Sequence, residues 1–406
     1  MEQITENQRL LLNLIGRTLF HAQTALPEEI DWDGVLTEAR QQAVLPLAYH
    51  AAKDCFTGEK AQILEDQINE VVVNNMLMDF EHVELHEAME AAGVPYVVMK
   101  GSASAAYYPQ PMLRMMGDVD FLVHREDAER AGAALKTLGF RETEEHDNPI
   151  HQAYIRKTDR ESEWELHWRP NGIPNTKVGE QIWAMLSDSI ETSRLRETDN
   201  GVYRVPDDFH HGLMMLIHTA MHLMHSGFGL RHLCDWAVFA AHFTEEGFRG
   251  LFEEKLRSVG LWDYAEALTA VSVRYLGCPD PGWVRELDPA LTDALLLDIM
   301  GGGNFGKKDS QRLNQAKLLV NRAEGTVQRG IGLRNLASAM NVKARRCLPA
   351  AAEHPILLPA GWVLAGAQHL SRIARGKRPA IHLGQMVEGA AVRSQLYRSL
   401  RLFEKE

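Results

Sequence analysis

The chain has 406 residues, of which 45% are hydrophobic and 24% are charged, and its formal net charge is −12. This is the composition of an ordinary globular chain, and the length is enough for two or three domains with substantial cores. The excess of acidic residues argues against a general nucleic-acid coat, because binding to phosphate backbones depends on clustered Lys and Arg. We therefore expect no long nucleic acid among its partners.

Neither a targeting segment nor a cysteine framework stands out in the sequence. The first residues, MEQITENQ, are acidic and polar, whereas a signal peptide begins with a cationic region followed by an apolar one. No stretch approaches the roughly 18 apolar residues of a membrane span. The four cysteines lack CxxC spacing, which indicates neither a disulfide framework nor a zinc ribbon. We predict a cytoplasmic protein with inert thiols.

Residues 1–92 carry the apolar spacing of helices. Leucines recur at helical intervals from Leu10 to Leu19, and a longer amphipathic pattern runs from Ile63 to Ala92. Gly93 is placed to close the last of these helices. The pattern predicts a helical prefix that packs against a sheet, and a partner-binding helix is the alternative.

The next stretch predicts a strand that leads into a glycine turn. Residues 96–99, YVVM, are apolar and β-rich, and Lys100, Gly101 and Ser102 break the run where a helix would begin. Such a turn offers free backbone N–H groups to a phosphate. We therefore expect a phosphate to bind at this turn.

Two carboxylates mark the following strand. Asp118 and Asp120 are two residues apart, so the alternation of a strand points both to one face, while Val119, Phe121 and Val123 point to the other. Adjacent carboxylates repel each other and are costly to desolvate, so a fold keeps them together mainly where a cation neutralises them. For hard oxygen ligands the usual cation is Mg²⁺. A phosphate turn beside metal-binding carboxylates favours nucleotidyl transfer.

A third carboxylate lies further along the chain. Residues 126–138 read as a helix, and residues 152–155 and 164–168 alternate as strands. In the second of these strands, Glu165 and His167 share one face. His167 is either a donor to substrate or a hydrogen-bonding partner of Glu165, and a plain structural histidine is the alternative.

Beyond Arg204 the pattern is helical. Pro206, Asp207 and Asp208 make a good helix start with acidic residues in the first turn. Four histidines then fall on one face of this helix, at positions His211, His218, His222 and His225. They could bind zinc, but no carboxylate or cysteine completes the set, so a polar face turned toward the cleft is favoured.

A glycine-rich stretch at 301–308, GGGNFGKK, matches the spacing of a P-loop. However, Lys308 stands where Ser or Thr should hold Mg²⁺, and the preceding residues LTDALLLDIM read as helix where a P-loop needs a strand. We therefore interpret the stretch as a flexible connector with two basic residues.

The C-terminal region is helical and basic. Residues 341–406 contain eleven Lys and Arg against four Asp and Glu, a formal charge of +7. A solvated basic face is favoured over contact with an anionic membrane surface or RNA. Residues 356–367 are apolar but too short to span a bilayer. We expect them to pack in a core or a dimer, with shallow membrane contact as the alternative.

These motifs together resemble a known family. MKGSASAAYY, Arg114, GDVDFLV and WELHW are similar to the KG…R…DxD…ExH pattern of a bacterial family of uncharacterised nucleotidyltransferases, within the polymerase β-like nucleotidyltransferase superfamily. The resemblance implies an α+β class, with a small mixed-sheet nucleotidyltransferase core embedded in a mostly helical chain. We expect an N-terminal helical segment (1–92), a catalytic core (93–200), a helical substrate-side domain (201–300) and a helical, basic C-terminal region (301–406).

The resemblance also implies a mechanism. The strand of Glu165 would lie beside that of Asp118 and Asp120, so that the three carboxylates are catalytic and hold two Mg²⁺ ions. An NTP such as ATP would give its NMP to a hydroxyl of a small molecule, a peptide or a protein. In this interpretation Lys100, Gly101, Ser102 and Arg114 bind the nucleotide, with a lysine that only extends from the strand end and a structural salt bridge of Arg114 as the alternatives. His167, His218 and His222 are candidate substrate-side residues, and the resemblance makes His218, His222 and Asp235 recurrent features without an assigned chemistry.

Two other classes stay open. A catalytically degenerate nucleotidyltransferase could serve as a nucleotide-binding scaffold, although the retention of all three carboxylates argues against this. A metal-dependent phosphohydrolase would also use clustered Asp and His residues. Hydrolases of the HD type need an adjacent His-Asp pair in a helix, and no such pair stands out in a helical context.

Overall fold

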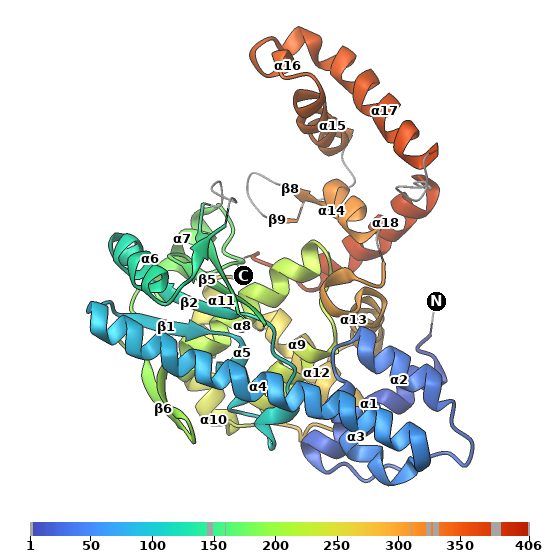
Figure 1. Cartoon of the computed structure of the whole chain (residues 1–406). Helices are drawn as coiled ribbons and strands as arrows, with labels where there is room; N and C mark the ends of the chain where they lie inside the picture. Colours follow the sequence, from blue (N-terminus) through green and yellow to red (C-terminus); the bar gives the residue numbers. More distant parts are fainter. Residues whose placement is uncertain are drawn as a thin grey trace.

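The structure of the protein, a computed structural model, describes residues 3–143, 149–158, 160–309, 311–321, 326–327, 333–374 and 383–404. It confirms the α+β class, because a five-stranded mixed sheet is embedded in a mostly helical chain (Figure 1). Within these residues no helix combines the length and the apolar character needed to cross a membrane.

Most of the secondary structure is helical. The helices in the described ranges are α1 Glu6–Phe20, α2 Trp32–Gln41, α3 Leu45–Ala52, α4 Gly58–Ala92, α5 Gly101–Ala105, α6 Ala128–Thr137, α7 Lys177–Met185, α8 Asp208–Met224, α9 Leu230–Ala240, α10 Glu245–Phe248, α11 Glu254–Ser258, α12 Trp262–Leu276, α13 Pro289–Gly302, α14 Arg312–Leu319, α15 Leu333–Cys347, α16 Ala350–Glu353, α17 Leu358–Ala374 and α18 Leu383–Ser399. The strands are β1 Tyr96–Met99, β2 Val119–Val123, β3 Arg141–Glu142, β4 His151–Lys157, β5 Glu161–His167, β6 Arg194–Thr198, β7 Gly201–Val205, β8 Val320–Asn321 and β9 Thr326–Val327.

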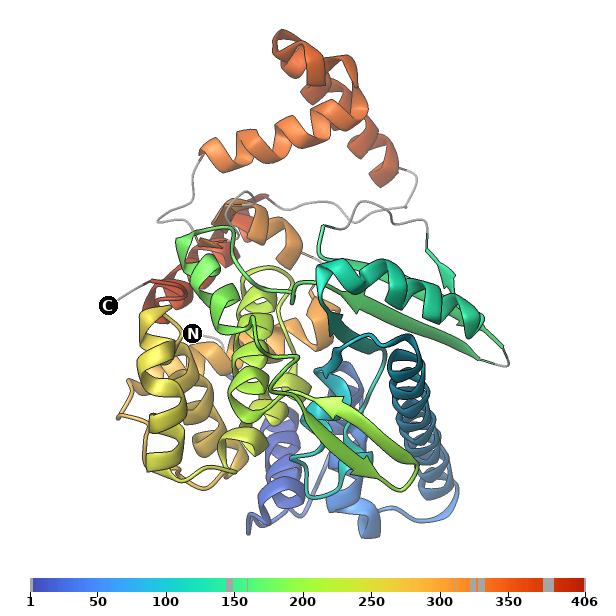
Figure 2. The same ribbon diagram turned by 90° about the vertical axis from the view of Figure 1, so that its left-hand side faces the viewer.

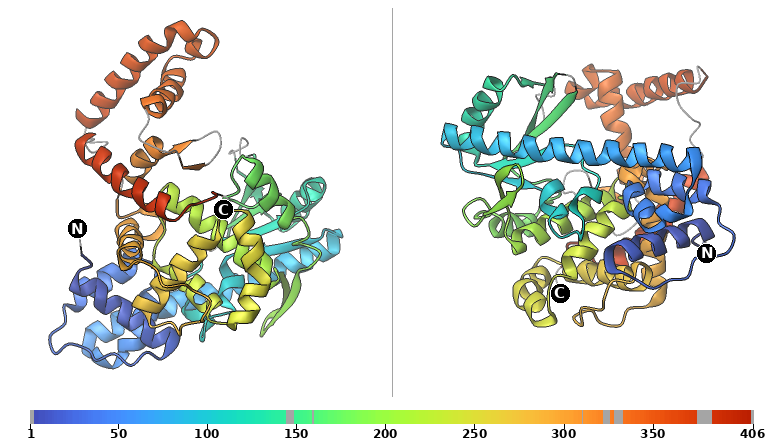
Figure 3. Two further views of the ribbon diagram at one scale, coloured as in Figure 1. Left: turned by 180° about the vertical axis from the view of Figure 1, so that it is seen from behind. Right: turned by 60° about the horizontal axis from the view of Figure 1, so that its bottom comes forward.

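The N-terminal segment is helical, as the apolar spacing predicts. Thr5 caps α1 through a capping box with Gln8, which satisfies two backbone N–H groups of the first turn. The long helix α4 ends at Gly93, whose φ of 61° lies in the left-handed region that glycine enters at little cost. Figure 3 shows α4 running along one side of the molecule, next to the sheet.

The central sheet has five strands in the order β1-β2-β5-β4-β3. Strands β2 and β5 run parallel, while the pairs β1–β2, β4–β5 and β3–β4 are antiparallel. In the parallel pair, Asp120 is the Cα partner of Glu165. The structure thus confirms that the strand of the third carboxylate lies directly beside the strand of Asp118 and Asp120.

The two faces of β2 belong to two different cores. Val119, Phe121 and Val123 are buried in a core that the sheet shares with α4 and α6. On the opposite face, Leu122 joins the larger core of the helical body, and Asp120 lies on the same face by the alternation of the strand. Figure 2 shows the sheet between these two helical layers. The acidic face of β2 is therefore directed toward the helical body.

The helical body begins with α8, whose start the sequence predicts correctly. Asp207 is the N-cap residue, and its carboxylate accepts a hydrogen bond of 2.9 Å from the backbone N–H of His210. Near the other end of the body, α13 leads directly into the glycine-rich stretch. The prediction of a helix before this stretch is correct, so the strand that a P-loop requires does not precede it.

The helices α15, α16 and α17 form an arm that stands clear of the rest of the chain (Figures 1 and 2). Ile356 and Val363, within the apolar stretch predicted to pack in a core or a dimer, are 88% and 73% exposed. These two side chains are not in the core of this chain. Dimer packing and membrane contact remain predictions for the arm.

Candidate active site

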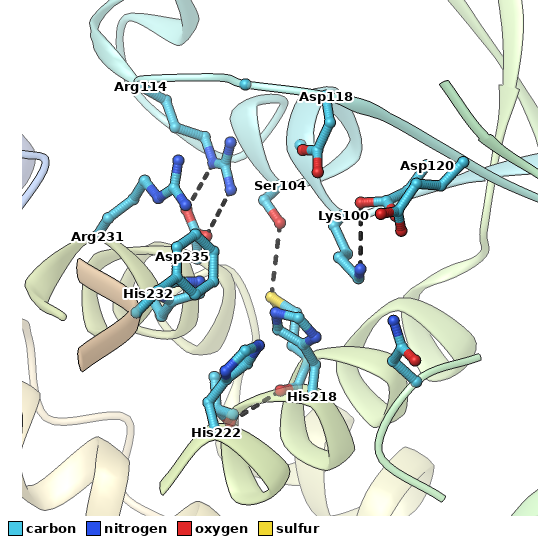
Figure 4. A pocket seen from close by; sticks show the side chains of 17 residues that line it. Lys100, Ser104, Arg114, Asp118, Asp120, His218, His222, Arg231, His232 and Asp235 are labelled. Carbon is cyan, nitrogen blue, oxygen red and sulfur yellow. Dashed lines mark hydrogen bonds and ion pairs between the residues drawn. The ribbon is translucent and has the colours of Figure 1, made fainter. Parts of the chain in front are cut away.

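One pocket of about 200 Å³ lies between the sheet and helices α8 and α9 (Figure 4). It brings together predicted site residues from four separate parts of the chain, namely Lys100, Gly101, Arg114, Asp118, Asp120, Glu165, His218 and His222. Ser102 and His167 do not line it and lie behind its wall. The sequence therefore predicts most of the lining on the side of the sheet.

The carboxylates sit where β2 and β5 meet the helical body. Asp118 precedes β2 and is exposed at the pocket, whereas Asp120 is buried. The charge of Asp120, helped by burial and by Glu165, raises the pKa of Asp118 to about 6. A cation bound between the two carboxylates would relieve this repulsion.

Lys100 supplies a positive charge to this group. Its ammonium lies 3.1 Å from Oδ2 of Asp120. Burial opposes ionisation of Lys100, but the charges of Asp120 and Asp118 raise its pKa overall. Its backbone has φ 55° and ψ −139°, a region that residues other than glycine rarely occupy. The turn is thus strained at the residue that points an ammonium at the carboxylates.

His167 contacts the carboxylates of both Asp120 and Glu165 from a position outside the pocket lining. Its Nε2 lies 3.0 Å from Oδ1 of Asp120 and 3.0 Å from Oε2 of Glu165, and the ring is fully buried. Burial of Asp120 favours its neutral form, but Lys100 and His167 together lower its pKa below the ordinary value. His167 is therefore a positioning residue for both carboxylates, which is one of the two roles that the sequence predicts for it.

The donor atoms fit a divalent cation. Among the described residues, one group of three ligand atoms lies within 4.8 Å of one another, formed by His151, Glu165 and His167. Of the three predicted metal ligands this group contains Glu165 but neither Asp118 nor Asp120, and Asp120 adjoins it through its contact with His167. Hard carboxylate oxygens suit Mg²⁺, while the imidazoles extend the set toward Mn²⁺. The four histidines of α8 form no such group in the described ranges.

Arg114 lines the pocket, but its guanidinium is engaged by a residue that the sequence analysis did not pair with it. Nε and Nη2 each lie 2.7 Å from a carboxylate oxygen of Asp235, which makes a buried, bidentate ion pair. The hydroxyl of Tyr108 donates to the same carboxylate at 2.7 Å. Arg114 thus ties the loop before β2 to α9.

The glycine turn offers backbone groups on one side and is anchored on the other. Gly101, with φ 31°, lines the pocket beside Asp118 and Lys100. Ser102 turns its side chain inward, where Oγ lies 3.1 Å from Nε2 of His82 on α4. The side chain of Ser102 therefore supports the turn and does not line the pocket, so the predicted contact with a phosphate is left to its backbone N–H.

The far wall of the pocket combines two predicted substrate-side residues with others for which the sequence predicted no role. Of the four predicted histidines, His218 and His222 of α8 line the pocket, whereas His211 packs behind Ser104, and His225, which follows α8, bonds the carbonyl oxygen of Met221. Arg231, His232 and Asp235 of α9 and Phe305 of the glycine-rich stretch complete the wall. Two signals could have pointed to α9, namely the closeness of Arg231, His232 and Asp235 on one helix and the family resemblance at Asp235.

Carboxylates from adjacent strands, facing cations across one pocket, are the arrangement of proteins that bind a metal-complexed polyphosphate and transfer a phosphoryl or nucleotidyl group. The chain belongs to the family described as uncharacterised nucleotidyltransferase, whose sequence model matches residues 28–277. The matched segment includes every predicted site residue and all of α8 and α9. A comparison with curated proteins found no match.

Proposed function

We propose that this protein transfers an NMP from an NTP to a hydroxyl group of a small molecule, a peptide or a protein. The observation that carries the proposal is the register of β2 and β5, which sets Asp120 opposite Glu165, with Asp118 directly before the same strand. The membership of the chain in a nucleotidyltransferase family supports it. The glycine turn after β1 and the carboxylates at the start of β2 also support a relationship to the polymerase β-like superfamily.

Asp118, Asp120 and Glu165 would hold two Mg²⁺ ions in this proposal. When bound, Mg²⁺ would neutralise the phosphates of the NTP and lower the pKa of the acceptor hydroxyl. The acceptor oxygen attacks the α-phosphorus in line, the bond to the bridging oxygen breaks, and pyrophosphate leaves with the electron pair. The hydroxyl proton passes to solvent.

The residues of the chain itself contribute position and charge. Lys100 faces the carboxylates at 3.1 Å and can turn its ammonium to a phosphate once a metal replaces it as the partner of Asp120. Gly101 presents the backbone of the turn, where a phosphate can approach without meeting a side chain. His167 fixes the direction of Asp120 and Glu165 through its two contacts of 3.0 Å.

His218 and His222 would face the substrate from the opposite wall. Burial and the charge of Lys100 lower the pKa of both rings, that of His222 to about 3, so both are neutral at pH 7. A neutral imidazole offers one donor and one acceptor. The two rings therefore suit hydrogen bonds to an uncharged part of a substrate, such as a sugar or an acceptor hydroxyl.

Calorimetric titration tests the proposal. Each of the four common NTPs is titrated with Mg²⁺ into wild type and into Asp118→Asn/Asp120→Asn. The matched control is Glu126→Gln/Glu129→Gln, which also removes two acidic charges but from exposed positions on or next to α6. We expect metal-dependent binding of at least one NTP in wild type and in the control, and none in the first variant. Failure of folded wild type to bind any NTP would refute the proposal.

A further inference from the structure

The wall opposite the carboxylates has a chemistry of its own. It consists of His218 and His222 from α8, Arg231 and His232 from α9, and Phe305 from η5 (Asn304–Gly306). The ring centroids of His222 and His232 each lie 5.1 Å from that of Phe305. Figure 4 shows Arg231 and His232 on the side of the pocket away from Asp118 and Asp120. The predicted metal site at Asp118, Asp120 and Glu165 includes none of these five residues, so metal binding there does not account for them.

Arg231 is a cation without an anionic partner. Among the described residues no Asp or Glu forms an ion pair with it, although the charges of Asp235 and Asp118 act on its pKa, and Arg114 engages both oxygens of Asp235. Its Nη1 donates to the carbonyl oxygen of Met115 at 3.1 Å, and its Nε is buried with no hydrogen-bond partner. A half-buried guanidinium without an ion pair, with one buried N–H left unsatisfied, is costly, so a ligand is the expected partner.

Other buried arginines of the protein do have carboxylate partners. Arg114 pairs with Asp235 at 2.7 Å, and Arg312 and Arg393 both lie beside Asp298. Arg231 lines the same pocket as Arg114, but no carboxylate of the described residues lies within ion-pair distance of it, and its central carbon is 5.3 Å from the centre of the Phe305 ring. The ring can attract the guanidinium without neutralising it.

The neighbouring imidazoles add hydrogen-bonding nitrogen atoms and no competing charge. The Nδ1 atoms of His218 and His232 are buried without a hydrogen-bond partner. Burial lowers the pKa of both rings well below the ordinary value, so neither carries a charge at pH 7. Three nitrogen atoms without a hydrogen-bond partner, one of them on a guanidinium, therefore belong to residues that line one wall of the pocket, and each becomes accessible to a ligand when its side chain turns.

We propose that Arg231 is the anchor of an oxyanion subsite, completed by His232 and His218, that binds a phosphate group of the substrate opposite the carboxylates. The subsite stands on these contacts alone, but its assignment to the triphosphate tail of the NTP rests on the proposed function. The same chemistry would also accept a phosphate carried by the acceptor. Either way, the planar fork of Arg231 makes two parallel hydrogen bonds to the phosphate oxygens.

Binding of inorganic pyrophosphate in the presence of EDTA tests the subsite without any metal. The variants are Arg231→Gln, which removes the charge, and Arg231→Lys, which keeps the charge but loses the fork. The control is Arg130→Gln, an exposed arginine of α6 that pairs with Asp127. By calorimetry we expect at least tenfold weaker binding for Arg231→Gln, an intermediate loss for Arg231→Lys and no change for the control. Absence of binding to folded wild type, or equal binding to Arg231→Gln, would overturn the subsite.

Two further titrations identify the source of the phosphate and separate the two proposals. If Arg231→Gln weakens binding of ATP with Mg²⁺ but not that of AMP, the subsite takes the tail of the donor. If ATP binding is unchanged while pyrophosphate binding is lost, the subsite takes a phosphate of the acceptor. Pyrophosphate binding that depends on Arg231 without any NTP binding would uphold the subsite and refute the proposed function. NTP binding in wild type together with pyrophosphate binding that does not depend on Arg231 would refute the subsite and leave the proposed function standing. Near-ultraviolet circular dichroism of each variant confirms the native fold.

Discussion

Asp120 and Glu165 are Cα partners across the only parallel strand pair of the five-stranded sheet, and the Nε2 atom of His167 lies 3.0 Å from a carboxylate oxygen of each. The two acids belong to strands more than 40 residues apart in sequence, yet the sheet fixes their separation. Asp118, by contrast, precedes the strand and is exposed. The sheet therefore fixes Asp120 and Glu165 more firmly than Asp118. Variants of the individual acids should differ in stability for this reason.

Replacing Asp120 and Asp118 by Asn should have opposite effects on the stability of the metal-free protein. Asp120→Asn leaves the buried Lys100 and His167 without their charged partner, and we expect a loss of about 1–3 kcal/mol. Asp118→Asn removes repulsion from Asp120, so its free energy of unfolding should equal or exceed that of wild type. Urea unfolding at pH 7 in EDTA measures both. Equal losses in the two variants would contradict the different environments of the two acids.

Metal binding should weaken as the pH falls through about 6. The pKa of Asp118 is raised to about 6, so its carboxyl is protonated below that pH and ionised above it, and only the ionised form binds a cation well. For a single proton in competition, the affinity for Mg²⁺ or Mn²⁺ should fall by up to tenfold for each pH unit below about 6. Calorimetry between pH 5 and 8, in buffers of different ionisation enthalpy, measures both the affinity and the proton released. An affinity that is independent of pH over this range would show that Asp118 does not contribute.

The sequence predicted what depends on local periodicity. The alternation of residues assigned Asp118 and Asp120 to one face, and the same rule set Glu165 on its strand. The family resemblance, and not the spacing, brought these two strands together, and the parallel register of β2 and β5 confirms it. The start of α8 and the end of α4 also followed from capping residues at Asp207 and Gly93.

The rest of the site depends on tertiary packing that no local pattern reveals. Arg114 and Asp235 are 121 residues apart, and nothing in either segment indicates that they pair. Phe305 reaches the pocket from a glycine-rich stretch whose spacing suggested a different kind of site. Arg231 stood out only once the structure showed that Asp235 was already engaged by another arginine. Long-range ion pairs decide which charges remain free for a ligand.

The backbone strain at Lys100 should appear as a difference in stability between its Ala and Gly variants. Lys100→Ala and Lys100→Gly both lose the ion pair with Asp120, but only glycine adopts φ 55° and ψ −139° without strain. We expect the Gly variant to be more stable than the Ala variant by about 1–2 kcal/mol, against the usual order in which glycine is the less stable residue. Thermal and urea unfolding compare the two. A more stable Ala variant would mean that Lys100 does not hold this conformation in solution.

The ion pair between Arg114 and Asp235 should be one of the most costly to break in the protein. Both side chains are buried, at 5% and 7% exposure, so removal of one partner leaves the other as an uncompensated charge. We expect Arg114→Met and Asp235→Asn each to lose about 3–5 kcal/mol of unfolding free energy, because a buried charge without a partner is strongly unfavourable. The double variant should lose much less than the sum of the two. Urea unfolding of all four proteins gives the coupling energy directly.

The exposed pair of Lys60 and Asp33 provides the matched control. Its nitrogen–oxygen distance is also 2.7 Å, but its side chains are 44% and 89% exposed, so water screens the attraction. Lys60→Met should therefore cost less than about 1 kcal/mol. If Arg114→Met cost no more than Lys60→Met, the guanidinium of Arg114 would not be committed to Asp235 in solution. Arg114 would then be available to the NTP as a direct phosphate ligand, which is the role that the family resemblance implies for it.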